Sequence, residues 1–128
     1  MKKVVFLVLA AVVLISCNTQ VPIDVTGTWS GSMTSSGAVP IELGLVDSGG
    51  AVTGSMRYYD SNYGWRYFGS VSGSHAQDGS ASFIAYASDG SGRIEFNGTF
   101  THSAFSGSAA LYDSNTYVLT ATVSLAKE

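Results

Sequence analysis

Cysteine, proline and basic side chains are all scarce in this chain. It has one cysteine, Cys17, and two prolines in 128 residues. A single cysteine cannot form a disulfide within the chain, so the fold must be stable without one. Lysine and arginine total six, and beyond Lys2-Lys3 they are scattered along the chain. The sequence therefore predicts no nucleic-acid binding, whose affinity depends on a basic face that neutralises phosphates.

Catalytic and metal-binding motifs are also lacking. The two histidines, His75 and His102, lie in or beside turns rich in glycine and serine, without the repeated spacing of a metal site. His102-Ser103 with Asp113 could be read as a nucleophilic triad, but serines are so frequent here that such trios arise by chance. Asp60–Gly64 has the start of a calcium-binding loop without its closing glutamate. We therefore expect no enzyme, no metal and no cofactor. An enzyme would need His75 or His102 to lie in a cleft beside a carboxylate.

The first residues have the three parts of an export signal. Lys2-Lys3 is basic, Val4–Ile15 is apolar, and the small Ser16 precedes Cys17. The twelve apolar residues would rise only about 18 Å as a helix, which is short of the roughly 30 Å hydrocarbon core of a bilayer. The segment is a poor membrane span and predicts a helical signal peptide, residues 1–16, that is later removed.

Leu14-Ile15-Ser16-Cys17 resembles the lipobox of bacterial lipoproteins, in which an apolar residue and small residues precede an invariant cysteine. The resemblance implies that Cys17 receives a diacylglyceryl group, that the signal is cut before it, and that the new amino terminus is acylated with a chain such as palmitate. Two or three acyl chains hold a protein firmly at a membrane. The alternatives are an ordinary secretory signal with a chance cysteine, or an uncleaved anchor.

The residue after the cysteine bears on location. In lipoproteins of bacteria with two membranes, an aspartate there tends to retain the protein in the inner membrane, whereas this chain has Asn18. The resemblance therefore predicts a lipid-anchored protein of the cell envelope, in the outer membrane where the cell has one.

The rest of the chain divides into a short linker, residues 17–25, and one domain, residues 26–128. Without the signal, four basic residues remain against nine acidic ones, a formal net charge of −5 that favours solubility. No window of the domain has an apolar pattern at helical spacing. Small polar residues alternate with Thr, Val, Tyr and Phe, which is typical of strands.

This alternation with period two predicts eight strands. Gly, Ser, Asp and Asn between them indicate hairpin turns. Eight antiparallel strands with short links, each with one apolar face, favour an all-β up-and-down meander barrel, with a two-sheet β-sandwich as the alternative. The predicted strands are Thr26–Thr34, Val39–Val46, Val52–Tyr59, Trp65–Ser72, Ser80–Ser88, Arg93–Thr101, Phe105–Asp113 and Thr116–Leu125.

The apolar faces of these strands predict the barrel interior. Bulky side chains there favour a filled interior, whereas inward glycines favour room for a ligand. The inward face of Ser80–Ser88 stays open, because Phe83 lies on one side and Ile84 and Tyr86 on the other. Gly27-Thr28-Trp29 resembles the Gly-x-Trp motif of lipocalin-like barrels, where the tryptophan closes one end. The predicted interior residues are Trp29, Met33, Phe96, Phe100 and Leu119.

Aromatic side chains crowd one predicted turn. When exposed, rings with polar ends are a usual contact surface for sugars or partner proteins. Strict alternation instead places Tyr58, Trp65 and Tyr67 on the core-facing side and leaves only Tyr59 and Tyr63 exposed. The candidate contact residues are Tyr58, Tyr59, Tyr63, Trp65, Arg66 and Tyr67.

The tetrapeptide Tyr-Asp-Ser-Asn occurs twice, at Tyr59–Asn62 and again 53 residues later at Tyr112–Asn115. Duplication of a half-barrel and convergent turn chemistry both explain the repeat. After the second copy, alternation places Tyr117 on the apolar face together with Leu119.

These observations predict a membrane-anchored bacterial lipoprotein with a small, non-enzymatic β-barrel binding module. One version holds a small apolar ligand inside the barrel, as the lipocalin resemblance implies. The alternative is a structural or interaction protein that contacts an envelope glycan or protein through the aromatic hairpin at residues 58–67.

Overall fold

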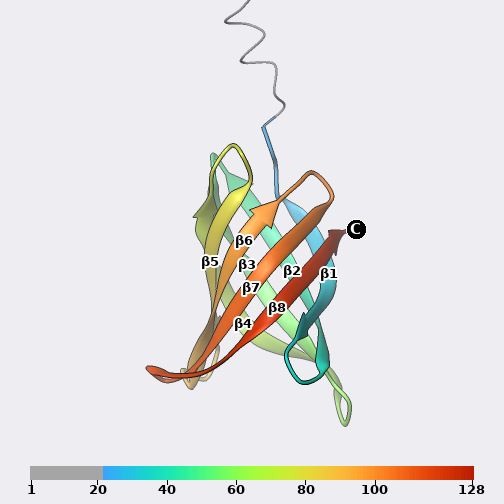
Figure 1. Cartoon of the computed structure of the whole chain (residues 1–128), viewed down its shortest axis with the longest axis vertical. Coiled ribbons are helices and arrows are strands. Elements are labelled where there is room, and N and C mark those ends of the chain that lie inside the picture. The colour runs from blue at the N-terminus through green and yellow to red at the C-terminus, as the bar shows by residue number, and fades with distance from the viewer. Residues whose placement is uncertain (1–21) are drawn as a thin grey trace, which may run out of the picture.

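Eight antiparallel strands close into one barrel in the computed structural model, which describes residues 22–128 (Figure 1). Each strand pairs with the next along the chain, and the last returns to pair with the first. The predicted signal peptide and Cys17 lie outside the described residues. The strands are β1 Gly27–Thr34, β2 Ala38–Ser48, β3 Ala51–Asp60, β4 Gly64–His75, β5 Ser80–Ala87, β6 Gly92–Phe100, β7 Ala104–Asp113 and β8 Thr116–Lys127.

Closure confirms the meander barrel and excludes the sandwich. Strand β1 is hydrogen-bonded to β2 along one side and to β8 along the other, from Trp29↔Lys127 to Thr34↔Thr122. A closed sheet has no unpaired edge at which another chain could add a strand. All eight predicted strands are present, with ends that differ by a few residues.

The barrel has two ends, which we name from the path of the chain. At the N-terminal end, residues 22–26 lead into β1, and the links 49–50, 76–79 and 101–103 lie beside them. At the distal end are the four other links, 35–37, 61–63, 88–91 and 114–115. Figure 1 shows the chain joining the barrel at the first end and the β3–β4 hairpin, in green, projecting from the second. Within the described residues, no helix has the length and apolar character to cross a membrane.

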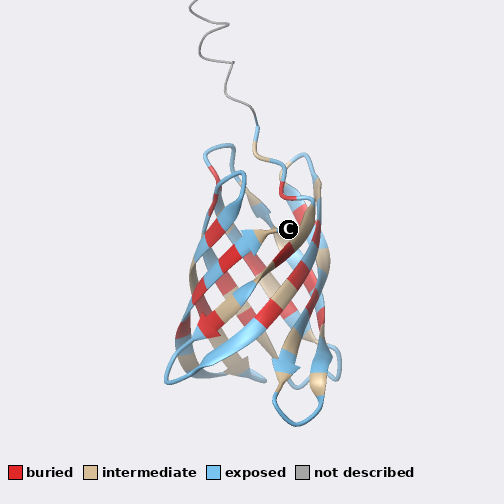
Figure 2. Ribbon diagram, turned by 90° about the vertical axis from the view of Figure 1, so that its right-hand side faces the viewer, coloured by how far each residue is buried: buried red, intermediate tan, exposed pale blue. Residues whose placement is uncertain are grey.

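Buried and exposed residues alternate along the strands, as the period-two pattern predicts (Figure 2). The interior is filled by large rings: the centroids of Phe83 and Phe96 are 4.8 Å apart, and those of Phe100 and Phe105 are 4.7 Å apart. Of the predicted interior residues, Leu119 is half-buried and packs against the core. The others are buried: Trp29, Met33, Phe96 and Phe100. Alternation left undecided which face of the fifth strand lines the interior. The structure shows that it is the face with Phe83 and Ala85, which point inward.

Inward glycines let neighbouring strands approach rather than leaving space for a ligand. A Cβ atom built on Gly69 would lie 1.6 Å from the carbonyl oxygen of Tyr86, and one on Gly31 would lie 1.9 Å from that of Ser124. The volume that a side chain would need is therefore already occupied by backbone of the next strand. Such close approach of neighbouring strands at glycine is typical of the sharply coiled sheet of a narrow barrel.

Two β-bulges interrupt the alternation near the distal end. Between β3 and β4 the register shifts after Met56, so that Phe68 is the extra residue of β4. Between β7 and β8 it shifts after Leu111, so that Val118 is the extra residue of β8. An extra residue reverses the faces of every side chain beyond it. The structure has no other register shift among the strand pairs of the barrel that it describes.

The bulges correct three predicted orientations. Strict alternation placed Trp65, Tyr67 and Tyr117 on the apolar face, but their exposed fractions are 42%, 62% and 54%. All three lie between a bulge and the hairpin turn, where the reversal takes effect. The prediction was wrong because it assumed an unbroken period of two.

Candidate functional site

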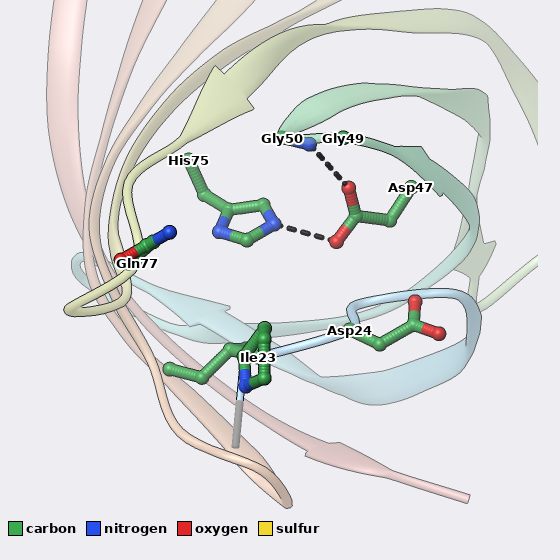
Figure 3. Close-up of a pocket in the computed structure, with 8 residues that line it drawn as sticks. Ile23, Asp24, Asp47, Gly49, Gly50, His75 and Gln77 are labelled. Atoms are coloured by element: carbon green, nitrogen blue, oxygen red, sulfur yellow. Dashed lines mark hydrogen bonds and ion pairs between the residues drawn. The ribbon is translucent and has the colours of Figure 1, made fainter. Parts of the chain in front are cut away.

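A histidine and an aspartate meet at the N-terminal end of the barrel. Asp47 lies near the end of β2 and His75 ends β4, 28 residues away in the chain. The imidazole Nε2 lies 2.5 Å from the carboxylate Oδ2, and the two side chains are only 5% and 6% exposed (Figure 3). No spacing or motif in the sequence links these residues. They meet because β2 and β4 both pair with β3, which places the two strand ends on either side of the start of β3.

Asp47 fastens the segment that precedes β1. Its Oδ2 accepts a hydrogen bond from the Val25 N–H at 3.1 Å, and its Oδ1 accepts one from the Gly50 N–H at 2.9 Å. The Asp47 N–H in turn donates to the Thr26 Oγ1 at 2.9 Å. One carboxylate therefore joins three parts of the chain: the N-terminal segment, the β2–β3 turn and the end of β4.

Apolar packing supports the same segment. Val25 is fully buried and Ile23 packs against the core. The Trp29 indole N–H donates a buried hydrogen bond of 2.8 Å to the Val25 carbonyl. Ile23 and Val25, which precede β1, therefore pack against the barrel core, and Trp29 lies in the interior near this end.

The geometry holds His75 in its charged form. Its Nδ1 lies 2.8 Å from the Ala76 carbonyl oxygen and its Nε2 faces the Asp47 carboxylate. Both partners are acceptors, so both ring nitrogens must carry a proton. Burial would lower the pKa of His75, but the hydrogen bonds to Ala76 and Asp47, with the charges of Asp47 and Asp24, raise it above its usual 6.5. Burial would likewise raise the pKa of Asp47, and its bonds from His75, Val25 and Gly50 lower it.

A cleft of about 360 Å³ borders this pair, lined by Pro22, Ile23, Asp24, Asp47, Gly49, Gly50, His75 and Gln77. His75 thus has the carboxylate partner and the cleft that an enzyme would need, which its place in the sequence did not indicate. General base catalysis needs a ring nitrogen that can take a proton from a substrate. Both nitrogens of His75 are already engaged, so the arrangement is suited to holding the chain together.

The other polar groups considered from the sequence are not brought together. His102 lies in the link before β7 and Asp113 ends β7, at opposite ends of the barrel, so the trio with Ser103 does not assemble. Asp60 caps its own turn, where its Oδ1 accepts a hydrogen bond from the Asn62 N–H at 2.8 Å. Among residues 22–128, no three His, Cys, Asp or Glu side chains are grouped so as to hold a metal ion.

The distal end has a different surface, the hairpin of β3 and β4. Four of its rings are exposed: Tyr59 by 44%, Trp65 by 42%, Tyr67 by 62% and Tyr63 by 75%. Tyr59 and Trp65 are opposite each other in the strand register, with ring centroids 5.7 Å apart at an interplanar angle of 77°. Tyr58, which strict alternation placed on the core-facing side, faces inward, is half-buried, and packs against the core and Phe68.

Two arginines lie over the rings of this hairpin. The Arg57 guanidinium is 4.8 Å from the centroid of Trp65, and that of Arg66 is 5.2 Å from the centroid of Tyr63. Arg57 also forms an ion pair of 2.7 Å with Glu42 on β2. Four of the six candidate contact residues line a shallow cleft on this hairpin: Tyr63, Trp65, Arg66 and Tyr67.

Comparisons with known proteins do not assign this chain to a family. No protein-family model matches it, and no curated protein is significantly similar in sequence. Its function is therefore inferred from the chemistry of the two ends of the barrel.

Proposed function

We propose that this protein is a bacterial envelope lipoprotein, anchored through lipid on Cys17, whose barrel binds another envelope component through the aromatic hairpin of β3 and β4. The observation that carries the proposal is the exposure of Tyr59, Tyr63, Trp65 and Tyr67 on that hairpin. Exposed aromatic side chains in a cluster mark contact surfaces, because they bury much area with few rotatable bonds. The core of the barrel is complete without them.

The position of the hairpin relative to the anchor supports this role. The described chain begins at Pro22, five residues after Cys17, and a fully extended chain of that length reaches at most about 17 Å. The N-terminal end of the barrel would therefore stay close to the membrane surface. The aromatic hairpin projects from the opposite end (Figure 1), where it would face away from the anchoring membrane.

The packed interior favours the surface hairpin over a small apolar ligand inside the barrel. Five aromatic side chains occupy the interior, and the inward glycines are covered by neighbouring backbone. We expect native mass spectrometry of the full chain, released from detergent micelles, to give the mass of the lipidated protein alone. An adduct of one defined mass that survives release would instead favour a ligand held inside. The interior rings are Trp29, Phe83, Phe96, Phe100 and Phe105.

The His75–Asp47 geometry supports a non-catalytic role. Both ring nitrogens of His75 lie against acceptors, the Ala76 carbonyl and the Asp47 carboxylate, and within residues 22–128 no serine or threonine side chain is hydrogen-bonded to this ring. We therefore propose that the pair fixes the N-terminal segment and that the protein is not an enzyme.

The hairpin is tested with the full-length lipoprotein in a detergent that has no sugar headgroup. We expect Tyr63→Ser combined with Tyr67→Ser to abolish retention of the envelope component that the wild type captures, with an unchanged thermal midpoint. Tyr86→Ser is the matched control, because Tyr86 is 46% exposed but lies on β5 outside the hairpin. Undiminished capture by the double variant would contradict the proposed function.

The anchor is tested separately with Cys17→Ser. We expect this variant to lose incorporation of labelled palmitate and to leave the membrane fraction, or to accumulate with its signal uncut. Unchanged labelling, processing and membrane retention would contradict lipidation at Cys17.

A further inference from the structure

The outer wall of the barrel has a second cleft beside the aromatic hairpin, with a volume of about 310 Å³, which we call the wall cleft. Trp65 and Tyr67 of β4 line it toward the hairpin, and residues of β1, β2 and β3 line the rest. Trp65, Arg66 and Tyr67 also line the cleft at the hairpin tip, so the two clefts adjoin at these residues. Sites for small ligands in proteins start at about this size, roughly 300 Å³.

Gly44 lies on the floor of the wall cleft, and the packing of the barrel does not require a glycine there. The nearest atom to a Cβ added at Gly44 is the Ser55 Oγ at 3.9 Å, which is an ordinary contact. Among the strand glycines of residues 22–128, Gly44 alone has neither a close neighbour nor a positive φ. Glycine weakens a strand relative to alanine. A strand glycine that the fold does not need often marks a place where a ligand approaches the backbone.

The residues beside Gly44 keep the floor low and supply hydroxyl groups. Thr28, Gly44 and Ser55 are aligned in the register of β1, β2 and β3. They belong to the outer face, because their neighbours Trp29 and Leu43 are buried in the interior. A ligand in the wall cleft would therefore lie close to the backbone of β2, between two hydroxyl groups.

The next row of the sheet toward the hairpin tip contains a charged pair. Glu42 and Arg57 are opposite each other in the register, and the Arg57 Nε lies 2.7 Å from the Glu42 Oε1. Within residues 22–128 this is the one hydrogen bond that either side chain forms. The second carboxylate oxygen and the two terminal guanidinium nitrogens can therefore still accept and donate. A hydroxyl group can do both, so neighbouring hydroxyl groups of a ligand suit this pair.

The aromatic side of the wall cleft is also held in place. The Arg57 guanidinium lies 4.8 Å from the centroid of Trp65, and Tyr67, opposite Arg57 in the register, is 62% exposed. The face of an aromatic ring is negative. The C–H groups on the face of a sugar ring carry partial positive charge and stack on such a surface, while the hydroxyl groups at its edge remain free to form hydrogen bonds.

Other ligand classes fit the wall cleft less well. Arg57 is paired with Glu42, and Arg66 lies 4.0 Å from Asp60, whereas a polyanion needs basic residues without partners. An extended peptide binds by adding a strand to a sheet edge, and the closed barrel has no free edge. A neutral molecule with an apolar face and a hydroxyl-rich edge matches both sides of the cleft.

From these contacts we infer that the wall cleft binds a neutral saccharide, whose ring stacks on Tyr67 and lies over Gly44. Its hydroxyl groups bond to Glu42 and Arg57. The inference rests on the proposed function and names the ligand class of its hairpin. Because no net charge is neutralised on binding, the affinity should change little between low and high salt.

The test uses the full-length lipoprotein in a detergent without a sugar headgroup, with cellulose, dextran, mannan and chitin as immobilised polymers. The polymer that retains the wild type is then supplied as short soluble oligosaccharides, whose affinities are measured by calorimetry at low and high salt. We expect one of the four polymers to retain the protein and its oligosaccharides to bind with little dependence on salt.

Gly44→Val is the decisive variant. Valine suits a strand, and its side chain would fill the floor of the wall cleft without meeting the backbone. We expect the affinity for the oligosaccharide to fall at least about tenfold, with an equal or higher thermal midpoint. Ser106→Val is the matched control, because it adds the same side chain to an exposed position of β7, on the far side of the barrel from β3.

Variants of Tyr67 test the stacking separately. Tyr67→Ser should lower the affinity for the oligosaccharide about as much as Gly44→Val does. Tyr67→Phe keeps the ring and should retain most of the affinity. Because Tyr67 is exposed, both variants should keep the thermal midpoint of the wild type.

Three outcomes would overturn the inference. Retention on none of the four polymers would exclude this ligand class, and the proposed function would still stand where capture of the envelope component depends on Tyr63 and Tyr67. Wild-type affinity in Gly44→Val would place the saccharide outside the wall cleft. A steep loss of affinity with added salt would indicate an anionic ligand. Undiminished capture by the double variant of Tyr63 and Tyr67 would instead contradict the proposed function itself.

Discussion

The two ends of this barrel use the same kinds of residue for different purposes. At the N-terminal end, Trp29 is buried and donates to Val25, and His75 and Asp47 are shielded and bonded to each other. At the distal end, Trp65 is 42% exposed and its closest ring partner, Tyr59, is exposed as well. The N-terminal end buries its tryptophan and pairs its charged groups within the fold. The distal end exposes its aromatic rings to solvent.

Stability and recognition are therefore located at opposite ends of this small barrel. A group whose bonds are all made within the fold contributes to stability and has nothing left to offer a ligand. A ring that is held in place by a hairpin but stays exposed contributes little to stability and much to binding. Substitutions at the two ends should therefore affect different measurements.

The largest effect is expected from Asp47→Ala. It removes three accepted hydrogen bonds and leaves His75 charged and shielded, which should lower the free energy of unfolding by about 3 kcal/mol. Chemical denaturation measures the change. The matched control is Asp113→Ala at the distal end, where the residue is exposed and a change within about 0.5 kcal/mol is expected. Equal losses for the two variants would remove the distinction between the ends.

The two tryptophans give the next largest contrast. Trp29→Phe leaves the buried Val25 carbonyl without its donor, so we expect a loss of about 2 kcal/mol. Trp65→Phe should change stability by no more than about 0.5 kcal/mol. Each variant retains a single tryptophan, whose fluorescence measures the exposure of one end of the barrel. Acrylamide should quench the fluorescence of Trp65 much more strongly than that of Trp29. Similar quenching in both variants would contradict the burial difference.

A smaller effect is expected from pH. Because the pKa of His75 is raised in the folded state, the pair stabilises the protein fully below about pH 6.5 and loses this contribution as the pH rises through the raised value. The lowered pKa of Asp47 works in the other direction, so its contribution is present above about pH 3.8 and is lost at more acidic pH. The free energy of unfolding should therefore decrease from mildly acidic to alkaline pH.

His75→Gln and His102→Gln identify the source of this slope. We expect the first variant to lose the decrease above pH 6.5 and the second to retain it, because His102 is exposed in the link before β7. Denaturation at a series of pH values measures both. If the free energy of unfolding of His75→Gln still decreased above pH 6.5, another group would be the cause of the decrease.

The smallest effect on stability is expected at the tip of the first hairpin. Tyr63 is 75% exposed, so Tyr63→Ser should change the free energy of unfolding by less than about 0.5 kcal/mol. Its effect on capture of the ligand should be far larger. A loss of stability comparable to that of Trp29→Phe would show that the distal hairpin also holds the fold together.

The strands and the core were predictable because both depend on local patterns. Alternation alone located every strand and placed Trp29, Met33, Phe96 and Phe100 in the interior, where they are buried. The same rule failed at Trp65, Tyr67 and Tyr117, since apolar residues such as Phe68 and Val118 read the same whether they continue the pleat or form a bulge.

The eight alternating segments and the turns between them could be predicted from the amino-acid sequence, because a period of two and the preferences of turn residues are properties of neighbouring residues. The folded structure was needed to show that Asp47 meets His75 and that Trp65, Tyr67 and Tyr117 face outward. Those facts depend on the register in which successive strands pair and on where a bulge leaves one residue unpaired. The pairing energy that sets this register is shared across the whole closed sheet, so no single stretch of the chain contains it.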